Sequence, residues 1–253
     1  MLALPMRSSS PGGERGHVED RFDSALIAGL LGLLAHDLRN PLSALQSNVN
    51  FIGGTTLGED PEIREAVADA VVSCEALGYV VENMEILGYG LTRAPARPLE
   101  PVRLLPFVEE CVAAHRALAI SHGARLELST PCPDPALQVM TQRDLLRRAL
   151  GNLLRNSIQH GPNGTVSVTL VPQGERVSVV VADQGPPLDP ELFDVAFQAE
   201  GQLKMKSSAR GRYGRGLGLY CARTAAHMVG ATVEPATPPA GATHAMALSV
   251  AWR

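Results

Sequence analysis

The stretch IREAVADAVVSCEALGYVVENMEILGYGL, residues 63–91, decides the first half of the fold, because its apolar side chains recur at alternating steps of four and three residues. The recurring positions are Ile63, Val67, Ala70, Cys74, Leu77, Val81, Met84, Gly88 and Leu91. A seven-residue repeat with two apolar positions is typical of a helix that packs lengthwise against another helix. We therefore predict a long helix with an apolar seam.

A matching seam lies upstream, at Ile27, Leu31, Leu34, Leu38, Leu42, Leu45, Val49 and Ile52. It gains one residue of phase at Pro41, where the missing N–H commonly kinks a helix. Gly53, Gly54 and the run TTLGED then interrupt the pattern. Two such helices joined by a short loop predict an antiparallel hairpin. Because one hairpin leaves part of its seam in water, we expect a second copy to complete a dimeric four-helix bundle.

The chain from about Pro101 onward has a different pattern. Helical runs cover 102–122, 143–160 and 217–229, and strand-like runs cover 125–129, 165–171, 176–182, 231–234 and 244–251. This mixture predicts an α+β fold in which helices cover a mostly antiparallel sheet. The expected divisions are a disordered tail at 1–21, the hairpin at 22–93, a linker at 94–101 and a second domain at 102–253.

Composition excludes several classes of function. The 22 Lys and Arg are outnumbered by 26 Asp and Glu, and five Phe, four Tyr and one Trp are few for base stacking, so we expect no nucleic-acid partner. The apolar stretch 25–35 is shorter than the roughly 20 residues of a membrane span, and it lacks the flanks of a secretory signal. The four cysteines form no C-x-x-C pair. We expect a cytoplasmic protein without a membrane span.

His36 is the first candidate site residue, within the sequence HDLRN at 36–40. With the seam leucines on the buried side, His36 falls at the most outward position of the helix. Asp37 is adjacent, and Asn40 follows one turn later. A histidine that points to water beside a carboxylate can act as a nucleophile, because the carboxylate accepts the imidazole proton as the nitrogen attacks. Taken alone, these residues also fit an ordinary solvated helix surface.

Two further groups of polar residues lie in the second domain. Asn152 and Asn156 are four residues apart on one helix, and their carboxamide oxygens can hold a hard cation such as Mg²⁺. Asp183 ends a strand, where its carboxylate can accept a hydrogen bond from an exocyclic amino group such as that of adenine, and Gly185 lets backbone approach a ligand. Taken alone, the two asparagines also fit a pair of exposed or capping residues, and Asp183 with Gly185 also fits a common Asp-x-Gly turn.

A glycine-rich run, GRGLGL at 214–219, precedes the helix expected from Leu217. Glycines at a helix N-terminus expose N–H groups and the positive end of the helix dipole to phosphate. The spacing differs from that of the dinucleotide-binding G-x-G-x-x-G. Nearby cations are Lys204, Lys206, Arg210, Arg212 and Arg215. This combination favours phosphate contact over a merely solvated basic loop.

Five motifs, in this order and after this hairpin, resemble those of the sensor histidine kinases of two-component signalling. HDLRNPL (36–42) resembles the H box, NLLRNSIQH (152–160) the N box, VADQG (181–185) the first glycine box, LFDVAF (192–197) the F box and GRGLGL (214–219) the second glycine box. The resemblance covers about residues 22–252. It implies a dimerisation and phosphotransfer hairpin followed by an α/β sandwich of the Bergerat ATP-binding type.

The same resemblance implies roles for individual residues. His36 accepts the γ-phosphoryl group of ATP with Asp37 as base, and Asn40 positions a water that dephosphorylates a partner. Asn156 holds Mg²⁺, and Asp183 reads adenine. The other implied nucleotide contacts are Asn152, Gly185, Arg212, Gly214, Gly216, Leu217, Gly218 and Thr243. The implied partners are a second copy of the chain, the receiver domain of a response regulator, and a separate sensory protein, since only about twenty residues precede the hairpin.

Three departures from the family pattern leave alternatives open. Pro187 replaces the second glycine of the first glycine box, Gln159 stands where lysine is frequent, and Met228 begins a Met-Val-Gly where the family has His-Gly-Gly. The leading hypothesis is an ATP-dependent protein histidine kinase. The alternatives are a phosphotransfer or phosphatase module with a degenerate nucleotide domain, and a non-catalytic dimeric scaffold.

Overall fold

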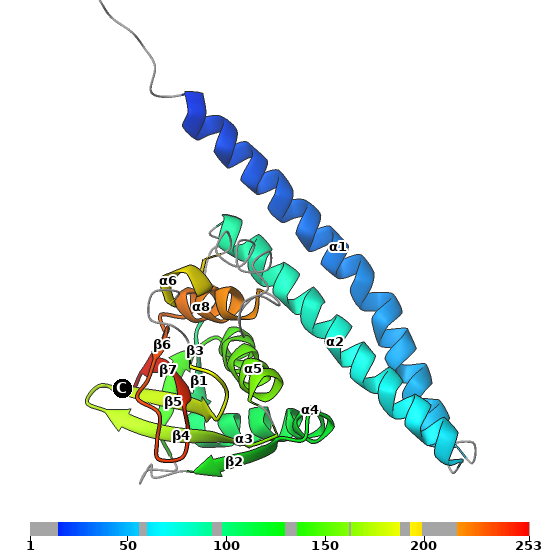
Figure 1. The fold of residues 1–253 in the computed structure, drawn as a ribbon. Helices are drawn as coiled ribbons and strands as arrows, with labels where there is room; N and C mark the ends of the chain where they lie inside the picture. The colour runs from blue at the N-terminus through cyan, green and yellow to red at the C-terminus, as the bar shows by residue number, and fades with distance from the viewer. Residues whose placement is uncertain are drawn as a thin grey trace, which may run out of the picture.

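Two long helices form the first part of the computed structural model, which describes residues 15–55, 60–92, 98–129, 136–161, 163–187, 193–198 and 217–252. They are α1 (Arg15–Gly53) and α2 (Pro61–Thr92), and they pack side by side as the expected antiparallel hairpin (Figure 1). α1 begins within the segment expected to be a tail, because the helix-breaking run SSSPGG ends at Gly13. Pro41 lies inside α1, as the sequence predicts.

Each helix carries two columns of apolar residues, and in α1 the buried column contains Ala28 and Ala35, which the expected seam did not include, whereas Ile27 of that seam is exposed. The inner column, at which the two helices meet, contains Ala28, Ala35 and Val49 of α1 with Cys74, Val81 and Gly88 of α2, all buried. The outer column remains in contact with solvent and contains Leu31, Leu38, Leu45 and Ile52 of α1 with Leu77, Met84 and Leu91 of α2. Within each column the residues recur at intervals of seven or fourteen, so a single hairpin uses only one of its two apolar columns.

The second part of the molecule contains a five-stranded sheet and a separate two-stranded one. Its elements are β1 (Glu100–Arg103), α3 (Leu104–Ala114), α4 (Arg116–Ser121), β2 (Arg125–Ser129), β3 (Gln138–Thr141), α5 (Arg143–His160), β4 (Thr165–Gln173), β5 (Arg176–Asp183), α6 (Phe193–Ala196), α8 (Gly218–Met228), β6 (Thr232–Pro235) and β7 (His244–Ala251). The large sheet has the order β2-β4-β5-β7-β6, in which only β2 and β4 run parallel. β1 and β3 pair separately, and at four residues each they are too short for periodicity to reveal them.

Helices α3, α5 and α8 cover one face of the large sheet and bury one core against it (Figure 1). The largest fully buried side chains include Phe107, Leu146, Leu150, Leu153, Leu154 and Ile158 from helices, and Leu170, Met246 and Leu248 from strands. α5 and α8 lie between the sheet and α2. The second domain is therefore docked on α2 through α5, which carries the N box, and α8, which begins within the second glycine box.

The end of the chain is tied to the turn between β4 and β5. The indole Nε1 of Trp252 donates a hydrogen bond to the carbonyl oxygen of Gly174 at 3.1 Å, and its backbone N–H donates to that of Glu175 at 3.0 Å. These contacts extend the pairing of β5 with β7 by one residue. Within the described ranges, no helix combines the length and apolar character needed to cross a bilayer.

Candidate functional site: motif residues of the second domain and the histidine hairpin

Helix α5 carries the two asparagines of the N box. Its apolar residues, which include Leu146, Leu150 and Leu153, recur at steps of three and four and anchor one face of the helix in the core. Four residues of helix advance the chain by about 6 Å and turn it by about 40° beyond a full circle. Asn152 and Asn156 therefore point to neighbouring but different surroundings.

Asn152 is buried at the contact between α5 and the hairpin. Its Oδ1 accepts a hydrogen bond from the Tyr79 hydroxyl at 2.6 Å, and its Nδ2 donates to Asn83 Oδ1 at 3.2 Å and to the Arg148 carbonyl at 2.8 Å. The sequence suggested that its oxygen faces a cation or nucleotide, whereas here that oxygen is bonded to α2. The sequence pattern predicts the helix that carries Asn152, but it does not predict that the Asn152 side chain contacts the hairpin.

Asn156 has unused hydrogen-bonding capacity. Its Nδ2 is buried and has no hydrogen-bond partner within the described structure. A buried polar atom without a partner costs roughly 1–3 kcal/mol, so such an atom in a folded protein needs an explanation. An acceptor on a bound ligand, such as a phosphate oxygen, would supply one, whereas the role predicted for Asn156 in holding Mg²⁺ concerns its oxygen and stays a prediction.

Asp183, Gly185 and Thr243 meet where the end of β5 lies beside the start of β7. The Asp183 carboxylate is fully buried, and its Oδ1 accepts a hydrogen bond from the Gly185 N–H at 2.8 Å. The Thr243 N–H donates to the Asp183 carbonyl at 2.9 Å, and its hydroxyl donates to the Gly185 carbonyl at 2.5 Å. The structure thus brings these three predicted residues together, although 58 residues separate Gly185 from Thr243.

This turn also adjoins the end of α5. A Cβ on Gly161, directly after α5, would lie 3.2 Å from the Asp183 Cβ. Pro187 is exposed two residues beyond Gly185, and the Asp183–Gly185 hydrogen bond forms in spite of it. The departure at Pro187 therefore leaves the turn that carries the carboxylate in place.

Gly218 begins α8, and Leu217 is its N-cap residue. A Cβ on Gly218 would lie 2.7 Å from the Tyr79 hydroxyl and 3.4 Å from Asn152 Oδ1, so a side chain at this position would displace the Tyr79 hydroxyl. The start of α8 thus adjoins Asn152 of the N-box helix. Three other predicted nucleotide contacts, Arg212, Gly214 and Gly216, lie outside the described residues.

His36 is exposed on α1, as the seam predicts, and Asn40 is exposed one turn further along. Asp37 belongs to the same helix, but its side chain lies outside the description. Arg39 connects this turn to the second domain. Arg39 and Arg148 each donate to a different carboxylate oxygen of Glu85, both at 2.6 Å. One carboxylate on α2 therefore bridges the histidine-bearing helix to α5.

Glu85 is held in its charged form by this bridge. Burial by itself would raise the pKa of Glu85, but the hydrogen bonds from Arg148 and Arg39 outweigh burial and lower it. The Arg155 guanidinium also lies 4.4 Å from the centre of the Tyr79 ring, within the range of a cation–π contact. Sequence reasoning missed Tyr79, Asn83 and Glu85, because they flank the seam and belong to none of the family motifs.

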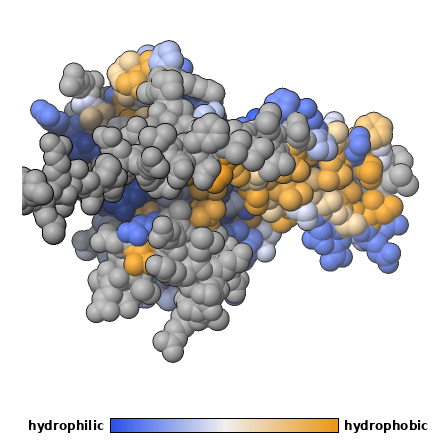
Figure 2. All heavy atoms as spheres, turned by 90° about the horizontal axis from the view of Figure 1, so that it is seen from above, coloured by the Kyte–Doolittle hydropathy of each residue, from blue (hydrophilic) through white to orange (hydrophobic). Residues whose placement is uncertain are grey.

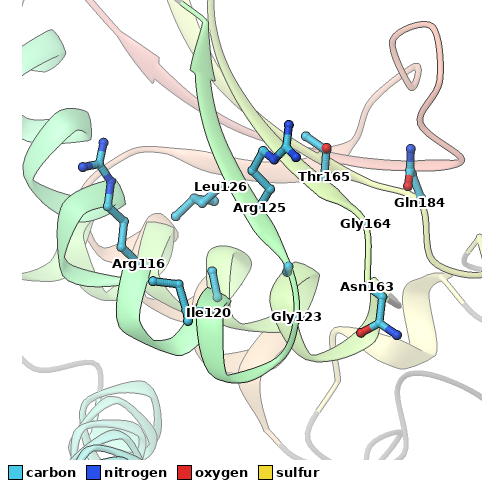
Figure 3. A pocket seen from close by; sticks show the side chains of 11 residues that line it. Arg116, Ile120, Gly123, Arg125, Leu126, Asn163, Gly164, Thr165 and Gln184 are labelled. Atoms are coloured by element: carbon cyan, nitrogen blue, oxygen red, sulfur yellow. The ribbon is translucent and has the colours of Figure 1, made fainter.

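A separate hollow of about 770 Å³ lies beside β2, between α4 and the start of β4 (Figure 3). Arg116, Arg125, Asn163 and Gln184 supply its polar lining. Arg125 also pairs with Glu127 at 3.6 Å, which offsets one of the two positive charges. None of the residues predicted to bind nucleotide lines this hollow, although Gln184 belongs to the first glycine box.

Comparison with known proteins finds similarity to histidine kinases and to a family of ATPases. Residues 141–250 match the family described as histidine kinase-, DNA gyrase B- and HSP90-like ATPase. The chain is 27% identical over 191 residues to the signal transduction histidine-protein kinase BaeS of Escherichia coli, covering 74% of this chain and 38% of BaeS. It is 30% identical over 227 residues to the sensor protein KdpD of Mycobacterium tuberculosis, covering 85% of this chain and 25% of KdpD.

The solved structure of full-length ShkA in complex with AMPPNP shares the fold. Its TM-score is 0.59 at 21% identity, covering 88% of this chain and 46% of that chain. Residues 141–250 thus match the model of this ATPase family, and the similarity to the curated relatives confirms the resemblance of the chain to sensor histidine kinases with a Bergerat-type ATPase domain. The chain spans roughly a quarter to two fifths of the length of the two curated relatives.

Proposed function

We propose that this protein is an ATP-dependent protein histidine kinase that phosphorylates its own His36 and passes the phosphoryl group to an aspartate of a response regulator. The observation that carries the proposal is the meeting of Asp183, Gly185 and Thr243 at the end of the N-box helix, in a chain that also presents an exposed histidine on a helical hairpin. The ATPase family of residues 141–250 supports ATP as the nucleotide.

The proposed chemistry follows from the residue types. A ring nitrogen of His36 attacks the γ-phosphorus, the bond from that phosphorus to the β–γ bridging oxygen breaks, and ADP leaves. Asp37 accepts the imidazole proton. Asp183 accepts a hydrogen bond from the adenine amino group. Asn156 would hold Mg²⁺, which offsets negative charge on the phosphates when bound.

A second transfer completes the proposed cycle. A carboxylate oxygen of the response regulator attacks the phosphorus on His36, and the phosphorus–nitrogen bond breaks to regenerate the imidazole. Asn40 follows His36 by about one helical turn and is exposed. From this place it can orient a water that hydrolyses the phosphorylated regulator, so the proposal includes phosphatase activity.

We also propose that the working unit is a homodimer. The outer column carries apolar side chains that one hairpin does not bury, with Leu38 46% exposed, Leu45 49% and Leu77 53%. Figure 2 displays hydrophobic surface gathered over the part of the hairpin that extends beyond the ATPase domain. A second copy supplies an apolar partner of matching seven-residue spacing.

The test is incubation of the purified protein with Mg²⁺ and γ-labelled ATP, beside His36→Ala and a matched control, His122→Ala. His122 is also exposed but lies after α4, in the second domain. We expect a label that is labile in acid and stable in base, present in the wild type and His122→Ala and absent from His36→Ala. A label that persists in His36→Ala would refute His36 as the acceptor. Absence of both label and ATP binding in every variant would favour the phosphotransfer or phosphatase module with a degenerate nucleotide domain, whereas ATP binding without label would indicate a kinase that needs an activator.

A further inference from the structure

The Tyr79 hydroxyl reaches out of the hairpin into the predicted phosphate end of the nucleotide pocket. It donates to Asn152 Oδ1 at 2.6 Å and lies against Gly218, where an added Cβ would be only 2.7 Å away. Tyr79 belongs to α2, whereas Asn152 belongs to α5 and Gly218 begins α8. One side chain of the first domain thus touches two motif residues of the second.

The Tyr79 hydroxyl lies beside the start of α8, and the start of a helix can bind phosphate. The first N–H groups of a helix have no partner within the helix, and they lie at the positive end of its dipole. They are the groups that hold a phosphate where a glycine-rich run precedes a helix. A side chain packed against Gly218 and bonded to Asn152 therefore occupies space beside the groups that would hold the phosphates and their cation.

The rest of the contact holds this side chain in place. The Arg155 guanidinium lies 4.4 Å from the centre of the Tyr79 ring. Asn83, one turn along α2, accepts a hydrogen bond from the other end of the Asn152 carboxamide at 3.2 Å. Together with its bond to the Arg148 carbonyl, Asn152 uses both of its N–H donors, and the Tyr79 hydroxyl takes one of the two lone pairs of its Oδ1.

We propose that Tyr79 is an autoinhibitory plug, so that nucleotide binds fully only when the hairpin withdraws Tyr79 from Asn152 and Gly218. The proposal rests on the ATP site put forward above. It means that docking of α2 on α5 and occupation of the pocket compete, and thermodynamic linkage requires each to weaken the other by the same factor. Signals that move α2 would then control access of nucleotide to the pocket.

The test is titration of the full chain with a non-hydrolysable ATP analogue and Mg²⁺ by calorimetry, for the wild type, Tyr79→Phe and Ser73→Ala. Tyr79→Phe keeps the ring beside Arg155 and removes the hydroxyl with its hydrogen bond to Asn152. Ser73→Ala also removes one hydroxyl from α2, but that hydroxyl bonds only the Asp69 carbonyl of the same helix. Because one hydrogen bond contributes modestly, we expect Tyr79→Phe to bind about three- to tenfold more tightly and Ser73→Ala to match the wild type.

The outcomes separate this inference from the proposed function. Analogue binding that is equal in the wild type and Tyr79→Phe, or weaker in Tyr79→Phe, overturns the plug and leaves the ATP site standing. Failure of every variant to bind the analogue overturns both. As a second readout, hydrogen exchange of the α2 amides around Tyr79 should accelerate when the wild type is saturated with the analogue, and unchanged exchange would contradict the competition.

Discussion

At the residue scale, the Asp183 carboxylate combines a structural contact with the proposed recognition of adenine. One oxygen accepts the Gly185 N–H at 2.8 Å, and the other is the proposed acceptor for the adenine amino group. Asp183→Asn keeps an oxygen for Gly185 but replaces the second acceptor with a donor. Since hydrogen bonds to charged groups are worth about 1.5–3 kcal/mol, we expect ATP affinity to fall roughly tenfold to a hundredfold.

The measurement is titration with ATP together with the thermal midpoint of unfolding. Asp69→Asn, an exposed position on α2, makes the same chemical change away from the sheet and serves as the control. Unchanged ATP affinity in Asp183→Asn, with the midpoint preserved, would remove Asp183 from the nucleotide site.

At the element scale, Glu85 connects three helices through one carboxylate. Its pKa is lowered, so the bridge stabilises the folded chain at pH values above the ordinary range of a glutamate, and this contribution is lost as the pH falls through the lowered pKa. Glu85→Gln lacks the charge at every pH. We expect its free energy of unfolding at pH 7 to be about 1–3 kcal/mol lower than that of the wild type, and this deficit should shrink as the pH falls through the lowered pKa of Glu85.

Urea unfolding of both proteins at several pH values checks this expectation. Glu110→Gln is the matched control, because Glu110 pairs with Arg143 between α3 and α5 and both side chains are substantially exposed, so its effect should be small. A deficit for Glu85→Gln that stays constant down to acidic pH would show that its charge is not the source of the stability.

The same elements show what the sequence could and could not predict. The bounds of α5 and β7 were predicted to the residue, because their apolar periodicity is long and regular. The α+β fold and the family resemblance were confirmed as well. The role of Asn152 at the hairpin could not be predicted, since it depends on how two domains dock. The two columns of the hairpin were likewise hidden, because spacing alone does not tell which leucine faces which neighbour.

At the scale of the whole molecule, the outer column predicts self-association. Burying a leucine side chain contributes about 1.5–3 kcal/mol. In a symmetric dimer, each outer leucine is buried in both copies, so its contribution counts once for each copy. We expect the wild type to sediment as a dimer and Leu45→Lys to associate at least tenfold more weakly. Ser47→Lys, which adds the same charge at an exposed position two residues away, should remain dimeric. Equal sedimentation of the two lysine variants would exclude the outer column as the interface.

Trp252 makes the two halves of this molecule optically distinct. It is the only tryptophan in the chain, and its indole is fixed to the turn between β4 and β5. Intrinsic tryptophan emission therefore follows the loss of the sheet and is blind to the melting of α1 and α2, whereas far-ultraviolet circular dichroism registers the helices of both parts. The chain thus carries its own reporter of one domain, and comparing the two spectroscopic transitions can reveal whether the domains unfold together or in sequence.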